Sequence, residues 1–306
     1  MDRLRGLRCA LTRERHGATA PWEKVSPAWE MVSPKSWMVP AVRQRPEWGV
    51  TPDLSSYASR YDHVAFTRDD QGILEMRLHS GDGPLIWGDG PHTELPYAFT
   101  DVGSDPENRV VILTGTGDRF LASLDESWVG AMTPLKWDKI YSHGKRLLQR
   151  LLEIPVPVIA AINGPATVHA ELAVLSDIVL AAEHSYISDA PHFKFGAVPG
   201  DGVHVVWPLL LGYNRGRYFL LTGQRLDAKE AQALGVVNEV WAAEALMNRA
   251  YEVARTLARQ PDTTLRYARD AMTQRLKRLL LDDLAYGLAL EGLGAYSSWP
   301  TGEPKQ

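Results

Sequence analysis

The sequence predicts an α/β protein with a parallel or mixed sheet in its N-terminal half and a covering layer of helices from its C-terminal half. Runs rich in β-branched and other apolar residues, at 109–115, 156–162 and 177–182, are typical of strands buried on both faces. Between the first two runs, residues 135–152 carry a wide apolar stripe at helical spacing. Strand, helix and strand with short glycine-containing joints describe β-α-β units. After Gly202 the chain is mostly helical in pattern.

The remaining elements extend this pattern to both sides. They are a strand at 73–78 with one polar face and helices at 225–235, 243–259 and 275–293. Gly235 ends the first of these helices, at a position where glycine is common. Because no linker divides residues 57–297, we expect them to form one domain, followed by a tail at 298–306.

Residues 1–56 differ in composition from the rest of the chain. They are rich in Arg, Pro and Trp and contain a short tandem, 22–27 and 29–34. One interpretation is a targeting or docking arm, because Arg3, Arg5 and Arg8 are compatible with a transit peptide. The other is a disordered or loosely packed extension, or a start codon assigned too early, with Met31 or Met38 as later candidates. We favour the second interpretation.

Composition excludes several functional classes. The 306 residues are 45% hydrophobic and 23% charged, with a formal charge of −4, which argues against nucleic acid as a partner. No apolar run reaches the roughly 18–20 residues that cross a bilayer, so no membrane segment is expected. Cys9 is the one cysteine of the chain, which excludes an internal disulfide and favours a reducing, cytoplasmic location.

Histidines in loops and at the ends of elements are the best candidates for chemistry. His192 lies in a small-residue loop, and Gly200-Asp201-Gly202 follows nine residues later at a predicted helix start. Asp201 is explained either as a helix cap or as the carboxylate that orients His192 as a general base. The sequence alone does not say whether the two side chains meet.

Two further segments carry candidate binding groups. His169 precedes a helix-like stretch beginning at Glu171, and a histidine beside a helix N-terminus is expected to be neutral. Trp87 and His92 are predicted to lie in another loop. An indole N–H only donates, which suits a carbonyl oxygen, although packing is the commoner role of a tryptophan.

Together these segments resemble the crotonase superfamily, also called the enoyl-CoA hydratase/isomerase family, from about Tyr57 to Gly292. The stretches that carry the resemblance are VVILTG at 110–115, FLA at 120–122, PVPVIAAING at 155–164, DIVLAA at 177–182, LTG at 221–223, AKEA at 228–231 and GVVN at 235–238. The resemblance implies a spiral of stacked β-β-α units with a C-terminal helical layer. It also implies assembly into a homotrimer or a hexamer (dimer of trimers).

The departures from the hydratase pattern concern the reacting groups. Hydratases have a glycine-rich stretch before Glu171, where this chain has Pro165-Ala166-Thr167-Val168-His169-Ala170. His192 stands where the second hydratase glutamate is expected. Glu171 remains, but hydration needs both carboxylates on one water, so the departures argue against acyl-CoA hydration.

A narrower resemblance, to the 6-oxocamphor hydrolase branch, accommodates these departures. That branch has a Trp and a His five residues apart, a lone His in the second loop, a His and an Asp nine apart, and a late Glu. The matching residues of this chain are Trp87, His92, His169, His192, Asp201 and Glu291.

This resemblance implies hydrolysis of a non-enolisable cyclic β-diketone to a keto acid by a retro-Claisen reaction. His192, oriented by Asp201, would activate water, while Trp87 and His169 would hold the carbonyl oxygen on which enolate charge develops. Glu291 and His92 would order the water or relay a proton. The small-molecule diketone is the one partner implied, and no metal or organic cofactor is needed. Trp128, Val129 and Phe193 are candidates for the pocket lining.

Two other functions stay open at this point. One is an enoyl-CoA hydratase/isomerase-type enzyme that acts on an acyl-CoA thioester. The other is a non-catalytic homologue whose assembly or tryptophan-rich arm binds a partner.

Overall fold

The computed structural model describes residues 51–128, 130 and 132–298, and a six-stranded sheet runs through this part of the chain. Its strand order is β1-β2-β4-β6-β7-β10, with β1 antiparallel to β2 and all other pairs parallel. The strands are β1 Val64–Arg68, β2 Ile73–Leu78, β4 Val110–Gly115, β6 Val158–Ile162, β7 Ile178–Ala182 and β10 Glu239–Trp241. The predicted α/β class is confirmed.

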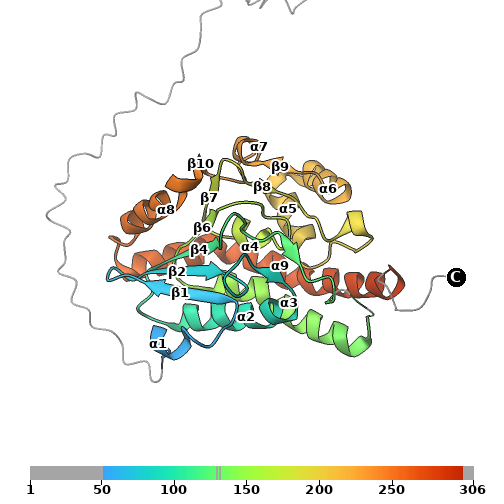
Figure 1. The fold of residues 1–306 in the computed structure, drawn as a ribbon, viewed down its shortest axis with the longest axis horizontal. Helices are drawn as coiled ribbons and strands as arrows, with labels where there is room; N and C mark the ends of the chain where they lie inside the picture. The colour runs from blue at the N-terminus through green and yellow to red at the C-terminus, as the bar shows by residue number, and fades with distance from the viewer. Residues whose placement is uncertain (1–50, 129, 131, 299–306) are drawn as a thin grey trace, which may run out of the picture. The chain divides into compact units, whose positions relative to one another are not determined.

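Two short strand pairs and a series of helices complete the described fold (Figure 1). β3 Ile86–Trp87 pairs in parallel with β5 Ser123–Leu124, and β8 Tyr186–Ile187 pairs antiparallel with β9 Leu226–Asp227. The helices are α1 Leu54–Tyr57, α2 Asp89–Ser104, α3 Pro134–Glu153, α4 Glu171–Val174, the 3-10 turn η3 Phe193–Phe195, α5 Val203–Leu211, α6 Tyr213–Thr222, α7 Ala228–Ala233, α8 Ala243–Leu257 and α9 Asp262–Ser298.

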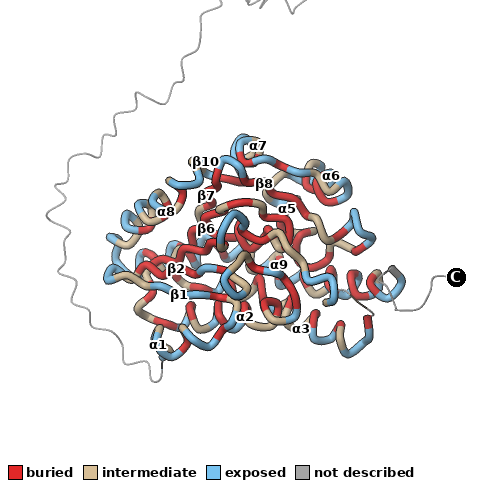
Figure 2. Tube along the Cα trace, in the orientation of Figure 1, coloured by how far each residue is buried: buried red, intermediate tan, exposed pale blue. Residues whose placement is uncertain are grey.

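Helices cover both faces of the sheet, which explains why its central strands are apolar throughout. Alternate strand residues such as Ile73, Ile112 and Ile159 pack against α8, in a core separate from the main one. The residues between them belong to the main core with the buried faces of α2 and α3. Figure 2 shows buried residues continuing along the strands, as expected when successive side chains enter opposite but equally apolar layers.

Several element boundaries differ from those predicted. Trp87 and His92 are not in a loop, because Trp87 ends β3 and His92 lies in the first turns of α2. The prolines of this segment argue against a helix in the sequence. Pro91, however, lies in the first turn of α2, where the backbone N–H groups make no intrahelical hydrogen bond and proline is tolerated. The helix predicted at 225–235 begins later, at Ala228, because Asp227 caps it and also pairs with β8.

The C-terminal half contributes more than the predicted helical layer. It adds the edge strand β10 to the sheet, and α9 is longer than the predicted helix at 275–293. At the other end, α1 begins at Leu54 after an Asp53 cap, within the predicted 1–56 extension. Residues 1–50 and 299–306 lie outside the described residues. Nothing among the described helices has the length and apolar character needed to cross a membrane.

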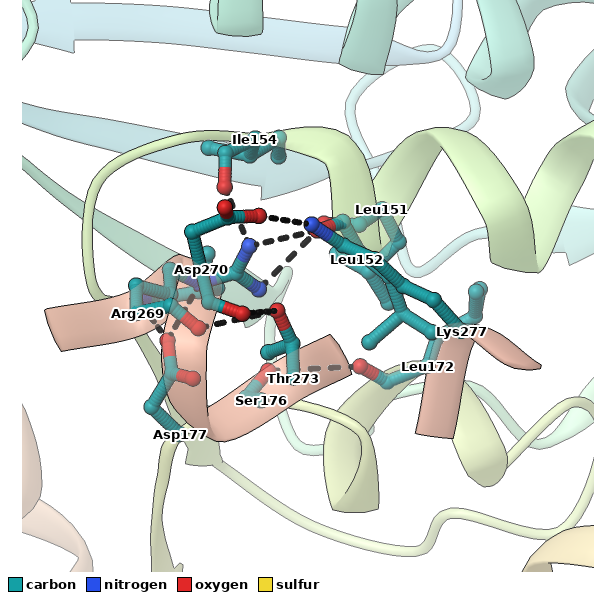
Figure 3. A network of polar contacts seen from close by, with 11 residues as sticks. Leu151, Leu152, Ile154, Leu172, Ser176, Asp177, Arg269, Asp270, Thr273 and Lys277 are labelled. Atoms are coloured by element: carbon teal, nitrogen blue, oxygen red, sulfur yellow. Dashed lines mark hydrogen bonds and ion pairs between the residues drawn. The ribbon is translucent and has the colours of Figure 1, made fainter. Parts of the chain in front are cut away.

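One buried arginine attaches α9 to the end of α3 (Figure 3). Arg269 is 1% exposed and donates to the carbonyl oxygens of Leu152 at 2.9 Å and Leu151 at 3.3 Å, and also to that of Ile154. These carbonyls belong to the last turn of a helix, where no intrahelical donor is available. The Nε atom of Arg269 lies 2.6 Å from Asp177, which also accepts from the backbone N–H of Val158 at 2.7 Å. A single side chain therefore joins α9, α3 and the start of β7.

We expect Arg269→Met to lower the free energy of unfolding by about 3–5 kcal/mol, because it removes the cationic partner of Asp177 and leaves several buried carbonyls at the end of α3 without this donor. Urea unfolding followed by circular dichroism measures this loss. Lys277→Met is the matched control on the same helix, since Lys277 pairs with the exposed Asp270 and such pairs contribute about 0–1 kcal/mol. Equal, small losses in the two variants would contradict this account of Arg269.

Candidate active site

The six residues singled out from the sequence line one cavity of about 480 Å³. They come from β3, α2, the turn before α4, the loop before α5, and α9. The rest of the lining is mostly apolar and includes Leu124, Trp128, Ile140, Val168, Phe195 and Leu288. Of the other predicted lining residues, Phe193 is half exposed and not part of the wall, and Val129 lies outside the described residues.

Two facing glycines allow Glu291 to reach residues that are far from it in sequence. A Cβ atom at Gly200 would lie 2.2 Å from the carbonyl oxygen of Gly287, and one at Gly287 would lie 2.3 Å from that of Gly200. The backbone of α9 therefore contacts the loop that carries Asp201. One turn after Gly287, Glu291 enters the same cavity.

His192 is held between carboxylates on both ring nitrogens. Its Nδ1 lies 2.6 Å from Asp189 Oδ1, while its Nε2 lies 3.4 Å from Asp201 Oδ2 and 3.7 Å from Glu291 Oε1. The structure thus differs from the expected His192–Asp201 dyad, because Asp189 makes the short orienting bond and Asp201 faces the other nitrogen. Asp189 is missing from the sequence prediction, although a carboxylate three residues before a histidine is a recognisable signal.

The charges in this cluster set the ionisation of each member. Burial alone would lower the pKa of His192, but the charges of Asp201 and Asp189 outweigh it and raise the pKa well above its ordinary value. Burial opposes ionisation of Asp201, yet His192 and His169 keep the pKa of Asp201 below its usual range. Burial raises the pKa of Glu291 to about 7.

His169 forms a second imidazole–carboxylate pair beside the first. Its Nδ1 contacts Glu171 Oε1 and lies 3.4 Å from Asp201 Oδ2. Burial acts to lower the pKa of His169, but Glu171 and Asp201 together raise it. The sequence analysis expected a neutral histidine from the helix N-terminus alone and did not include these two carboxylates. The helix that follows is only one turn, and its field is weaker than that of two adjacent carboxylates.

The backbone of His169 is also unusual, because its φ of 45° lies in the left-handed region. Such a conformation costs a non-glycine residue about 1–3 kcal/mol and is maintained only where the surroundings impose it. Here it turns the chain directly before α4, with the imidazole 4.2 Å from the Trp87 ring, centroid to centroid.

Trp87 and His92 complete the wall next to His169. Trp87 is 1% exposed, and its indole Nε1–H has no acceptor among the described residues. Burial, with the neighbouring charge of His169, lowers the pKa of His92 to about 3, so His92 is neutral. Its ring lies 5.3 Å from that of Trp128, centroid to centroid.

Two triads of side chains lie close enough together to suggest a metal ion. They are His169 with Glu171 and Asp201, and His192 with Asp201 and Glu291, with donor atoms within 4.8 Å of one another. Imidazole–carboxylate contacts account for both groups.

Comparison with known proteins identifies the family. The model of the enoyl-CoA hydratase/isomerase family matches residues 70–290. The chain belongs to this family. As a crotonase-family enzyme it is 35% identical to a putative enoyl-CoA hydratase/isomerase of Bacillus subtilis over 251 residues, which cover 80% of this chain and 93% of that protein. The predicted family and crotonase fold are confirmed.

Two solved structures illustrate the range of this family. A β-diketone hydrolase from the cyanobacterium Anabaena sp. PCC 7120, bound to (S)-3-oxocyclohexyl acetic acid, is 49% identical with a TM-score of 0.77. The similarity covers 83% of this chain and 98% of that one. An enoyl-CoA hydratase/isomerase from Mycobacterium paratuberculosis is 27% identical with a TM-score of 0.72, covering 77% and 94% of the two chains.

We expect Gly287→Ala to lower the free energy of unfolding by about 1–3 kcal/mol, because its Cβ would overlap the Gly200 carbonyl and the ring of His204. Alanine is normally the better helix former, so any loss comes from this contact. Urea unfolding measures the change. Gly83→Ala is the control, since its nearest neighbour would be 3.9 Å away, and we expect a change within about 0.5 kcal/mol. A Gly287→Ala protein as stable as wild type would contradict the proposed close contact.

Proposed function

We propose that this crotonase-family enzyme hydrolyses a carbon–carbon bond of a non-enolisable cyclic 1,3-diketone and releases a keto acid. The observation that carries the proposal is the presence of two kinds of group in one cavity. The cavity is lined by an imidazole held by a buried carboxylate, and also by the indole N–H of Trp87, which has no acceptor among the described residues and lies beside His169.

The reaction begins with water. Neutral His192 donates Nδ1–H to Asp189, which leaves the Nε2 lone pair free to take a proton from water. The hydroxide adds to one carbonyl carbon and forms a tetrahedral alkoxide. Asp201 and Glu291, both next to Nε2, are placed to order the attacking water and to stabilise the imidazolium that forms.

Collapse of the alkoxide breaks the bond to the carbon that lies between the two carbonyls. The electron pair of this bond passes to that carbon and onto the oxygen of the second carbonyl, as an enolate. The His192 imidazolium then returns its proton to the enolate carbon. One water is consumed, and the products are a carboxylic acid and a ketone within one molecule.

The enolate oxygen needs hydrogen-bond donors, because a carbanion is otherwise a poor leaving group. Trp87 Nε1–H lacks an acceptor among the described residues, and the raised pKa of His169, which Glu171 and Asp201 bring about against the effect of burial, favours a donating imidazole. Donors of this kind stabilise developing charge in a closed site by about 2.7–4 kcal/mol each.

The lining of the cavity favours a neutral substrate over an acyl-CoA thioester. No Lys or Arg is among the described residues that line the cavity, whereas phosphate groups are usually bound by such cations. Glu171 is in contact with His169, so it is not free to work on a water as hydratase chemistry requires. These features count against the acyl-CoA alternative.

The ligand of the Anabaena enzyme suggests the substrate class. (S)-3-Oxocyclohexyl acetic acid is a keto acid. Removing water to join its carboxyl carbon to the ring carbon beside the ketone, across the ring, gives a bicyclic diketone. A bridgehead carbon then separates the two carbonyls and cannot enolise. We propose a bicyclic 1,3-diketone of this type as the substrate. We also propose that the enzyme is a homotrimer or a hexamer and acts in the cytoplasm.

The direct test follows the loss of ultraviolet absorbance across a panel of bicyclic 1,3-diketones. We expect turnover of at least one bicyclic compound, with release of one acid per molecule in a pH-stat. An enolisable monocyclic diketone serves as the control that should not react. An inert panel, or turnover of an enoyl-CoA in its place, would reject the proposed function.

Substitutions test the assignment of His192 in the same assay. We expect His192→Ala to lower kcat by about 10²–10⁴-fold, the usual contribution of a general base. Asp105→Asn is a control for loss of a buried carboxylate remote from the cavity, because Asp105 accepts from Tyr57 and Arg68 in the core. It should affect stability while leaving kcat near wild type. Wild-type kcat in His192→Ala would contradict the role of His192.

The pH dependence follows from the same charges. The base must be neutral, and Asp201 and Asp189 outweigh burial in raising the pKa of His192, so kcat/KM should fall as the pH drops through a midpoint above about 6.5. Asp201→Asn removes a charge that stabilises the imidazolium, and the midpoint of its residual activity should move to lower pH. Asp105→Asn should keep the wild-type midpoint. An unchanged or higher midpoint in Asp201→Asn would show that Asp201 does not control the base.

A further inference from the structure

We propose that Glu171 is a positioning residue that holds His169 as a doubly protonated imidazolium, so that His169 donates its Nε2–H to the enolate oxygen. This inference rests on the proposed function and assigns a role to the glutamate that the family shares with hydratases. In this chain Glu171 would act through a histidine and not on water.

The contact between the two residues supports this role. Glu171 is 1% exposed, and its Oε1 contacts His169 Nδ1. Among the described residues, His169 is its one ion-pair partner. A carboxylate this deeply buried needs a cation or several donors nearby to stay ionised. Burial raises the pKa of Glu171, and the charge of His169 opposes that rise, so the imidazole is the cation that can keep Glu171 ionised.

The orientation of the ring then fixes which protons His169 must carry. Nδ1 is occupied by Glu171, so only Nε2 is left for a ligand in the cavity, and it has no hydrogen-bond partner among the described residues. A neutral ring would place its one proton on Nδ1 and turn a lone pair toward the substrate. A lone pair repels an enolate oxygen. Only the imidazolium donates to Glu171 and to the enolate at once.

The groups around His169 allow this charge. Asp201 lies 3.4 Å from Nδ1 and adds a second negative charge, while His192 opposes the charge from the far side of Asp201. His92, whose ring lies 6.5 Å away, is itself neutral. The Trp87 ring lies 4.2 Å from the His169 ring, tilted by 48°, and its N–H has no acceptor among the described residues. Two carboxylates, Glu171 and Asp201, therefore lie next to His169, whereas His192 is the one nearby group that can add a positive charge among the described residues.

A stable enolate measures this role without turnover. Cyclohexane-1,3-dione ionises readily in water, and its anion imitates the enolate intermediate, whereas cyclohexanone has the same ring and no charge. We expect wild-type enzyme to bind the anion more tightly than cyclohexanone in calorimetric titrations. Glu171→Gln should lose about tenfold or more of this preference, the contribution of one charge-assisted bond, and bind cyclohexanone as before.

Nuclear magnetic resonance of ¹⁵N-histidine-labelled protein follows the protonation of His169 itself. The signal that disappears in His169→Gln identifies the resonance of this residue. In Glu171→Gln the imidazole should lose its proton at lower pH than in wild type, and kcat should fall by about 10²–10³-fold. Glu171→Asp, which keeps the charge, should recover part of both properties. It also provides the comparison if the glutamine variant folds poorly.

Glu75→Gln is the matched control. Glu75 is a buried glutamate of β2 that pairs with Arg77 and accepts from Tyr251, and it does not line the cavity. It should leave the anion preference, the His169 titration and kcat as in wild type. The inference is overturned if Glu171→Gln keeps the anion preference, keeps the His169 titration, or keeps kcat. An inert diketone panel would instead reject the proposed function, and the binding and titration results would still decide the Glu171–His169 pairing.

Discussion

Asp201 lies between two imidazole rings, and the organisation of the site depends on this one buried carboxylate. Its Oδ2 is 3.4 Å from Nε2 of His192 and 3.4 Å from Nδ1 of His169. Each imidazole has a carboxylate of its own as well, Asp189 for His192 and Glu171 for His169. Without Asp201, the two rings would lie close together with no negative charge between them. Its charge allows them to lie side by side.

The scaffold serves to bring this cluster together. α9 is attached to α3 through Arg269 and to the loop before α5 through the contact of Gly200 with Gly287. Both attachments come before Leu288 and Glu291, the residues of α9 that line the cavity, and they set the position of Glu291. A buried arginine and two glycines therefore matter to the chemistry without touching the cavity contents.

The proposed reaction differs from hydration because a few charged side chains differ from those of a hydratase site. A hydratase site needs two carboxylates acting on one water, whereas here His192 takes the place of one and His169 engages the other. The two imidazoles lie side by side, one on each side of Asp201, and much of the remaining cavity wall is apolar. The proposed substrate, a neutral ring with two carbonyls, is compatible with this lining.

The sequence by itself determined the central strands and most of the long helices, because hydrophobic periodicity is a property of the chain. Its resemblance to a known family also identified the family and six of the residues that line the cavity. It did not determine that Trp87 and His92 lie on a strand and a helix, since the prolines of 89–104 obscure the helical pattern. Nor did it show which carboxylate meets which ring nitrogen. Asp189, three residues before His192, takes the orienting place that spacing alone suggested for Asp201. Hydrogen bonds and ionisation depend on distances of a few ångströms and on burial, and only the tertiary structure decides those.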